Sequence, residues 1–468
     1  MDARIRSRLL QVFTRQTAEQ EEEWLAQVFL PPARWPYWQR EDESLLVVGE
    51  SGSGRTALAR MFLSGTPSQG APSPFKVLWE PAPPARTAYA TAWEVLGAQL
   101  LREGVKALLS YLARHGHWTT SRPQWFDTAL YQLVHGVLPE PVQMHLWPLV
   151  RQGEGGASAL QDILLGEQEV PVEHVTFAEG AAYLVTLVQV LGFSAVWVVM
   201  DIPSEETEFG LGLLEAWANT LRFMDVPGLV FKCLVPRHIF ERLSHTVGVL
   251  RRRLPPEALR WTGEDMQALV EKRLAWATEG RWTRLQDVVA DDAFLEWLRD
   301  YGRGHPRAWL GLMAPFIQAR VEREQPLGPE DWLRLARAFP PPLYVDEAQR
   351  RVYAGAREIS LAGEETWKLL RYLYRRGGQI CSREEIYFQG LLGMARVPSP
   401  DDPDYEAPAL WRARLDTLLY RLRKDIEPDP RKPVYLETVR GQGIRLRHTA
   451  TALGLRRQPL DLGFVRRE

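Results

Sequence analysis

A glycine-rich segment between residues 49 and 56 has the composition of a phosphate-binding loop. Its sequence, GESGSGRT, matches the pattern G-x-x-x-x-G-K-[ST], except that Arg55 stands at the lysine position. Glycines let backbone N–H groups turn toward phosphate oxygens, and the N-terminus of a following helix adds positive potential. The Thr56 hydroxyl is then a candidate ligand of Mg²⁺. The predicted phosphate contacts come from Gly49, Gly52, Ser53, Gly54, Arg55 and Thr56.

Arg55 keeps the positive charge of the usual lysine but not its shape. A planar guanidinium is bulkier than an ammonium group and fits less readily between the β- and γ-phosphates. We therefore expect binding of ATP or ADP with slow or no hydrolysis. Two alternatives stay open, namely a nucleotide site that has lost catalysis and a glycine-rich turn without a ligand.

A carboxylate at the end of an apolar strand supports the same chemistry. The run VWVVMD puts Asp201 where an aspartate can hold Mg²⁺ through water, so it is the first candidate catalytic residue. Ile202 follows, where an acidic residue would activate the attacking water. Glu205 or Glu206 could supply that carboxylate from the loop. The alternative is that Asp201 only caps a turn.

A predicted helix at 408–426 has one apolar and one basic face. The apolar side chains recur at spacings of four, three and four, at Leu415, Leu419, Leu422 and Ile426. The opposite face carries Arg414, Thr417, Arg421 and Lys424. A basic stripe on a helix that packs by its other side suits the major groove of DNA, where arginine can bond guanine in a bidentate manner.

A predicted hairpin at 434–447 turns at Gly441–Gly443 and adds more arginine. Arg440, Arg445 and Arg447 are suited to phosphates or to a narrow minor groove. The alternative for both segments is a solvated basic face without a ligand.

The remaining pattern divides the chain into elements that would hold these residues. Residues 1–28 resemble one amphipathic helix. Strands are predicted at 44–48, 75–79, 194–200, 228–235 and, as a short fifth, 259–261. Strands separated by helices imply a parallel sheet covered on both faces. Residues 262–339 are predicted to be helical, and Pro340–Pro342 marks a boundary.

The C-terminal part has a different pattern. LYVD, RRVYAG and EISL predict a small antiparallel sheet after residue 342. An amphipathic helix at 364–376 follows and is stopped by two glycines. A capping box at Ser382–Glu385 opens a second helix, and the helix at 408–426 is the third.

Composition describes an ordinary globular protein, with 45% hydrophobic and 25% charged residues among 468. Residues 341–468 hold 23 Lys and Arg against 18 Asp and Glu, a net charge of +5, which leaves −7 for residues 1–340. A basic C-terminal part favours nucleic acid as a partner.

Several features indicate the cytoplasm. Two cysteines cannot form a disulfide framework, and the first 16 residues lack the apolar stretch of a secretory signal. Ala181–Met200 has no charged residue and is long enough to cross a bilayer. Gly192 divides it into a helix-like and a strand-like half, so we expect a buried helix and strand and no membrane span.

The phosphate loop and Asp201 together resemble the P-loop ATPases of the AAA+/STAND group over about residues 30–335. PGLVFKCLVP is similar to their sensor-1 strand, and RWTGEDMQALVEKRLAWA to the start of their helical lid. Gly304–Arg307 (GHPR) is similar to their sensor-2 motif, which implies that Arg307 is a catalytic residue near the phosphates. The resemblance implies ATP or ADP and Mg²⁺ as cofactors and a homo-oligomer as a candidate state.

The C-terminal part resembles the winged-helix output domain of OmpR/PhoB-type response regulators. The matching segments are 361–373, 382–384, 415–430 and 437–446. The resemblance implies that bases are read by Arg414, Thr417, Leu418 and Arg421. It implies phosphate contacts from Arg423 and Lys424, and wing contacts from Thr438, Arg440 and Arg445. Leu418 would suit a thymine methyl, and Ile444 replaces the family's usual tyrosine.

The sequence thus predicts an α/β protein with a parallel-sheet P-loop NTPase core, a helical lid and a C-terminal α+β winged helix. The predicted parts are an N-terminal helix and linker, the core, the lid, the winged helix and a tail, at 1–40, 41–250, 251–340, 341–450 and 451–468.

The favoured function is a regulator in which ATP or ADP controls binding to double-stranded DNA. RNA polymerase or another protein is a further candidate partner. The alternatives are an ATPase of a mobile-element or genome-defence system acting on DNA, and a pseudo-ATPase scaffold whose winged helix binds protein.

Overall fold

The computed structural model divides the chain into two compact units, Met1–Gln16 with Trp261–Glu468, and Thr17–Arg260. The structure describes residues 2–14, 17–40, 42–64, 72–80, 89–120, 122–138, 141–151, 155–165, 175–203, 210–215, 226–242, 254–302, 305–354, 357–399, 402, 405 and 408–449. Glu205, Glu206, Gly304 and the tail lie outside the described residues.

The unit Thr17–Arg260 is built on a five-stranded parallel sheet, as the sequence predicts. The strands are β1 (Leu45–Gly49), β2 (Phe75–Leu78), β3 (Val196–Asp201), β4 (Leu229–Pro236) and β5 (Pro256–Ala258). Their order is β2-β3-β4-β1-β5. Because β1 and β3 both flank β4 in parallel, Gly49 and Asp201 end at the same edge of the sheet.

The fifth strand was expected at 259–261 but lies at Pro256–Ala258, where it pairs with β1. The apolar residues of LRW favoured the later position. At the sheet edge, however, pairing uses backbone groups, so the side chains of β5 are not required to be apolar and are mostly exposed.

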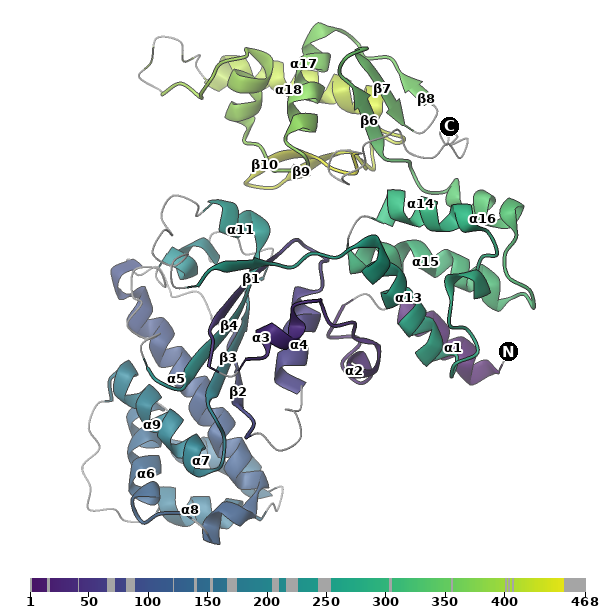
Figure 1. Cartoon of the computed structure of the whole chain (residues 1–468). Helices are drawn as coiled ribbons and strands as arrows, with labels where there is room; N and C mark the ends of the chain where they lie inside the picture. The colour runs from purple at the N-terminus through teal and green to yellow at the C-terminus, as the bar shows by residue number, and fades with distance from the viewer. Residues whose placement is uncertain are drawn as a thin grey trace. The chain divides into compact units, whose positions relative to one another are not determined.

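Helices cover both faces of this sheet (Figure 1). The helices of this unit are α2 (Leu25–Val28), α3 (Trp35–Trp38), α4 (Arg55–Ser64), α5 (Tyr89–Arg114), α6 (Trp125–Val137), α7 (Val142–Arg151), α8 (Ala157–Leu165), α9 (Phe177–Val190) and α11 (Arg237–Arg242), with the 3₁₀ turn η1 (Gly116–Thr120). Of these, α4, α5, α9 and α11 contact the strands. Along β3, Val196 and Val198 join the core formed with α5 and α9. Trp197 points the other way and contacts Phe62 of α4, with ring centroids 6.0 Å apart.

The uncharged stretch at 181–200 folds as expected into a helix and a strand. Gly192 separates α9 from β3 and has a φ of 91°, a value that favours glycine. Within the described part of the chain, no helix is long and apolar enough to cross a membrane.

In the other unit, the first helix packs with the helical segment after residue 261. That segment contains α13 (Gly263–Ala277), η3 (Leu285–Asp287), α14 (Asp292–Gly302), α15 (Pro306–Val321) and α16 (Pro329–Ala336). Arg273 donates to the Val12 carbonyl at 3.0 Å, and the Arg8 guanidinium lies 5.3 Å from the Trp276 ring centroid. The expected single helix at 1–28 is therefore wrong. It is replaced by α1 (Ala3–Thr14), which buries its apolar stripe against α13 and α15, and by α2.

The C-terminal part has a winged-helix topology. It comprises β6 (Leu343–Asp346), β7 (Arg351–Ala354), β8 (Arg357–Ile359), α17 (Glu364–Arg375), η4 (Glu385–Leu391), α18 (Pro408–Ile426), β9 (Leu436–Val439) and β10 (Gly443–Leu446). The first three strands form an antiparallel sheet, and the last two form the wing hairpin. The capping box is present, with the Glu385 N–H donating to Ser382 Oγ at 3.1 Å. The helix that it opens, η4, is a π-helix.

Candidate phosphate loop and nucleic-acid interface

The loop after β1 has the backbone that its glycines predict. Gly52 and Gly54 have φ values of 83° and 92°, which residues with a Cβ rarely adopt. A Cβ at Gly49 would come within 2.5 Å of Ser53 Oγ and 2.9 Å of Arg55 Cγ. The loop then enters α4, a helix of ten residues whose N-terminus carries positive potential.

The structure brings Arg55 and Thr56 together with Asp201. Thr56 Oγ1 donates to Asp201 Oδ2 at 2.7 Å. Arg55 Nη1 lies 3.1 Å from Asp201 Oδ1 and donates to the Ile202 carbonyl at 2.9 Å. The Arg55 side chain is only 7% exposed, so this ion pair is largely shielded from water. Two predicted phosphate ligands therefore contact the predicted metal aspartate.

These contacts bear differently on the two expected cofactors. Backbone N–H groups of a glycine loop at a helix N-terminus fit a nucleotide phosphate. Mg²⁺ fits the side chains less well, since both oxygens of Asp201 accept hydrogen bonds and one of the donors is the cationic Arg55.

Arg307 lies at the start of α15 and is exposed. It belongs to the unit that contains Trp261–Glu468, whereas the loop belongs to Thr17–Arg260. Its expected role near the phosphates stays a prediction.

On α18 the structure separates an apolar face from a polar face. Arg414, Thr417, Arg421 and Lys424 are exposed, as the spacing predicts. Leu418 is 3% exposed and lies in the core, so the prediction that it faces bases is wrong. The reason is that the apolar stripe is wider than four positions and includes residue 418 between Leu415 and Leu422.

Tyr420 is a residue that sequence reasoning missed. Its side chain is 65% exposed on α18. It lies three positions after Thr417 and four before Lys424, so the helical spacing alone could have placed it on the polar face.

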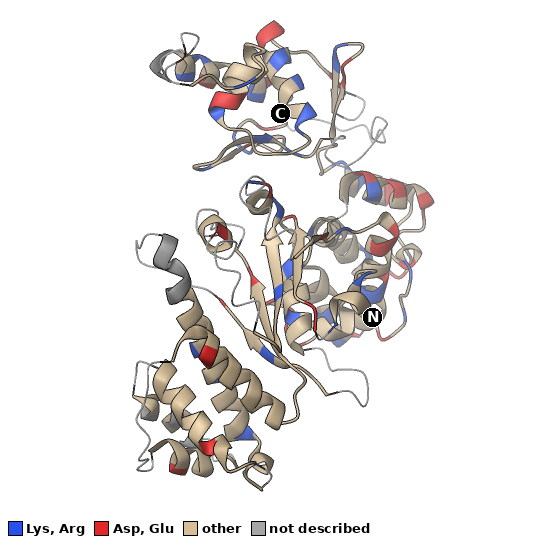
Figure 2. Cartoon of the chain, turned by 60° about the vertical axis from the view of Figure 1, so that its left-hand side comes forward, with Lys and Arg blue, Asp and Glu red and all other residues tan. Residues whose placement is uncertain are grey.

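Acidic neighbours partly neutralise this face, and Figure 2 shows both signs of charge on the winged-helix domain. Arg414 forms an ion pair with Glu365 of α17, and this hydrogen bond raises the pKa of Arg414. Asp416 on α18 binds Arg383 at 2.5 Å. Arg421 and Lys424 are exposed basic side chains toward the C-terminal end of the stripe.

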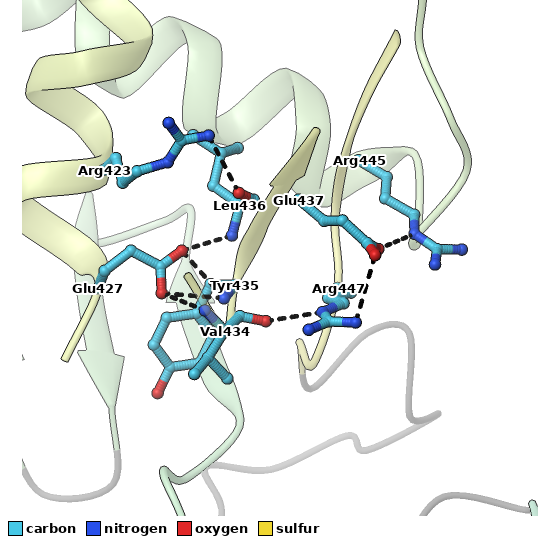
Figure 3. A network of polar contacts seen from close by, with 8 residues as sticks. All are labelled: Arg423, Glu427, Val434, Tyr435, Leu436, Glu437, Arg445 and Arg447. Atoms are coloured by element: carbon cyan, nitrogen blue, oxygen red, sulfur yellow. Dashed lines mark hydrogen bonds and ion pairs between the residues drawn. The ribbon is translucent and has the colours of Figure 1, made fainter. Parts of the chain in front are cut away.

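A buried carboxylate fixes the start of the wing (Figure 3). Glu427 is 1% exposed and accepts the N–H groups of Val434, Tyr435 and Leu436, at 2.6, 3.0 and 2.6 Å for the shortest contacts. Arg423 donates to the Leu436 carbonyl and to Thr438 Oγ1, each at 3.3 Å. Arg423 was expected at DNA phosphates, but its guanidinium contacts the wing and thereby joins α18 to β9.

Two arginines of the wing bond to other wing residues, and a third is exposed near the turn. Arg445 Nε donates to Glu437 at 2.5 Å, and Arg447 donates to the Val434 carbonyl at 3.0 Å (Figure 3). Arg440 and Thr438 are exposed near the turn. Arg440 is thus the wing residue best placed to meet a phosphate.

Comparisons with known proteins match only part of the chain. No family model matches it. The chain is 33% identical to Protein PetR of Rhodobacter capsulatus over 105 residues. That match covers 22% of this chain and 40% of PetR, so the chain spans two fifths of that relative's length. The C-terminal part of the chain has the winged-helix topology described above, and the likeness to PetR extends over a segment of similar length.

A solved structure matches the same share of this chain as PetR does. It is the crystal structure of the Klebsiella pneumoniae RstA DNA-binding domain in complex with the RstA box, at 24% identity and a TM-score of 0.17. The match covers 22% of this chain and 87% of that chain.

Proposed function

We propose that this chain is a transcription regulator that inserts α18 into the major groove of double-stranded DNA and that binds ATP or ADP at the loop 49–56. The observation that carries the DNA part is the exposed stripe of Thr417, Arg421 and Lys424 on a helix buried by its other face. A helix held in this way can present arginine to guanine without first rearranging.

The wing supports the same conclusion. Glu427, through buried hydrogen bonds, and Arg423, through a partly buried one, hold the start of β9 against α18. Arg440 at the turn can then bind a backbone phosphate at a fixed distance from α18. Nucleotide control is the further step of the proposal, and its support is the loop geometry at Gly49–Thr56.

The test is selection of binding sites from a random duplex pool by the full chain, with and without ATP and Mg²⁺. A motif enriched in one nucleotide state only is the expected result. The same motif in both states would retain DNA binding and reject nucleotide control. No enrichment in either state would reject DNA binding.

Matched variants separate the two parts of the proposal. Thr56→Ala removes the hydroxyl that contacts Asp201, so it is expected to abolish the nucleotide effect and to leave the selected motif unchanged. Nucleotide-dependent DNA binding that persists in Thr56→Ala would count against control through this loop.

A second candidate function is a scaffold whose winged helix binds protein. The exposed Tyr420 on the basic face favours it, since exposed aromatic side chains are enriched at protein interfaces. DNA affinity that is weak and insensitive to salt would favour this candidate, because phosphate contacts make affinity fall steeply with salt. DNA-stimulated ATP turnover would instead favour an ATPase acting on DNA.

A further inference from the structure

The arrangement around Asp201 bears on which cation accompanies a nucleotide at the loop. The carboxylate receives a cationic donor at Oδ1, from Arg55 at 3.1 Å, and a neutral donor at Oδ2, from Thr56 at 2.7 Å. The guanidinium of Arg55 therefore already compensates the negative charge of Asp201. The Ile202 carbonyl accepts a hydrogen bond from Arg55 Nη1 at 2.9 Å, which fixes the guanidinium in this position.

A divalent cation would compete with that guanidinium. Mg²⁺ requires oxygen ligands at about 2.1 Å in near-octahedral geometry. A metal bound through Thr56 and Asp201 would lie beside Arg55, and the two cations would repel each other strongly because the Arg55 side chain is only 7% exposed. The residues present thus do not fit Mg²⁺ while Arg55 contacts Asp201.

A phosphate group does fit the same arrangement. A guanidinium has five N–H donors, so it can bond a carboxylate and a phosphate oxygen together. A lysine ammonium is a single point charge and serves two such partners less well. A guanidinium that bonds both Asp201 and a phosphate oxygen therefore explains why arginine stands at position 55 and why it contacts Asp201.

We propose that Arg55 takes the place of the divalent cation, so that the loop binds nucleotide phosphates without Mg²⁺. This inference rests on the proposed nucleotide binding and specifies its chemistry. With the guanidinium on Asp201, and with apolar Ile202 next to it, this carboxylate is compensated by the chain's own cation. We therefore expect slow or no hydrolysis of the bound nucleotide.

The test is the affinity of the full chain for a fluorescent N-methylanthraniloyl ATP, measured in EDTA and in excess MgCl₂. The wild-type dissociation constants are expected to agree within about threefold. Arg55→Lys is expected to bind at least about tenfold more tightly with Mg²⁺ than with EDTA, because the guanidinium no longer occupies Asp201 Oδ1. Arg60→Lys is the matched control on the same helix, where Arg60 pairs with Glu22, and it should behave as wild type.

A second variant guards against misfolding of Arg55→Lys. Asp201→Asn removes the charge that holds Arg55, so the freed guanidinium should tighten binding in EDTA by a few-fold. Wild-type binding that requires Mg²⁺, or loss of binding in Asp201→Asn with intact thermal unfolding, would overturn the proposal. Absence of binding in both buffers would overturn it together with nucleotide control, whereas the DNA part is judged separately by the selection experiment.

Discussion

The buried cations of the sheet unit and the exposed cations of α18 lie in different environments. In Thr17–Arg260, Arg55 and Lys232 are buried and bonded to groups of the same unit. In the winged helix, Arg421 and Lys424 remain on the surface of α18. A buried cation with internal partners sets local structure, whereas an exposed cation is available to a polyanion. The basic side chains of α18 are thus already at the surface, whereas Arg55 would have to release Asp201 before a metal could bind there.

The largest effect is expected at the buried carboxylate of the wing. Glu427→Ala leaves three backbone N–H groups without their acceptor, so it should lower the free energy of unfolding by about 4 kcal/mol. Urea unfolding of the full chain measures this. Glu358→Ala removes an exposed carboxylate 3.7 Å from Arg351 and should change the free energy by less than about 0.5 kcal/mol. Equal effects of the two variants would mean that Glu427 does not hold the wing.

The next prediction concerns the buried lysine of β4. Lys232 donates to the carbonyls of Trp38, Arg40 and Glu43, and burial lowers its pKa to about 8. Between about pH 8 and pH 10.5 the unfolded chain keeps a proton that the folded chain has released. The contribution of Lys232 to the free energy of unfolding should therefore rise with pH across this window, by up to about 3 kcal/mol.

The pH dependence is checked by denaturant unfolding of wild type and Lys232→Met at several pH values. The variant should lose the rise, whereas Lys106→Met, at a half-exposed surface pair, should keep it. A rise that survives in Lys232→Met would assign the titration to another group.

Loss of an exposed cation should act on binding and not on stability. Arg421→Ala should weaken binding to the selected DNA site by about 10- to 100-fold, because a bidentate contact to guanine is lost. Fluorescence anisotropy with labelled duplex measures the affinity. Arg371→Ala, an exposed position on α17, is the matched control. A comparable loss in both variants would indicate that only net charge matters.

The smallest effect is expected at the tyrosine on the same face. Tyr420→Ala should leave unfolding unchanged and weaken DNA binding by only a few-fold, about 1 kcal/mol. Leu418→Ala should instead destabilise the domain by about 3 kcal/mol, because it empties part of the core. Thermal unfolding and anisotropy on both variants separate the two roles. The opposite pattern would restore Leu418 as the base-reading residue.

Much of the fold could be predicted because local spacing determines it. The bounds of α18 and β6 follow from amphipathic periods within each segment. The capping box marked the start of η4, but the same box opens a helix of any pitch, so the π-helix could not be foreseen. Leu418 was misassigned because an apolar stripe of five positions was taken for one of four.

The sequence predicted which residues belong to the candidate sites, but not which of their side chains contact one another. The loop pattern named Arg55, Thr56 and Asp201, yet the direction of the Arg55 side chain depends on a carboxylate 146 positions away. Tyr420 was missed because attention to basic residues passed over an aromatic one at the same spacing. For Arg55 the missing information was a long-range contact, whereas for Tyr420 the helical spacing already contained it.

The packing of α1 has a consequence for how the chain is made. Val12 bonds to Arg273, so the first helix and its partners are separated by 261 positions. The whole sheet unit is, in topology, an insertion within the other unit. During synthesis α1 is made before α13 and α15, so Leu9, Val12 and Phe13 cannot be buried until those helices have also been made. A truncated chain that begins after residue 260 would expose the complementary apolar surface of α13 and α15, so excision of the winged helix should begin after α16.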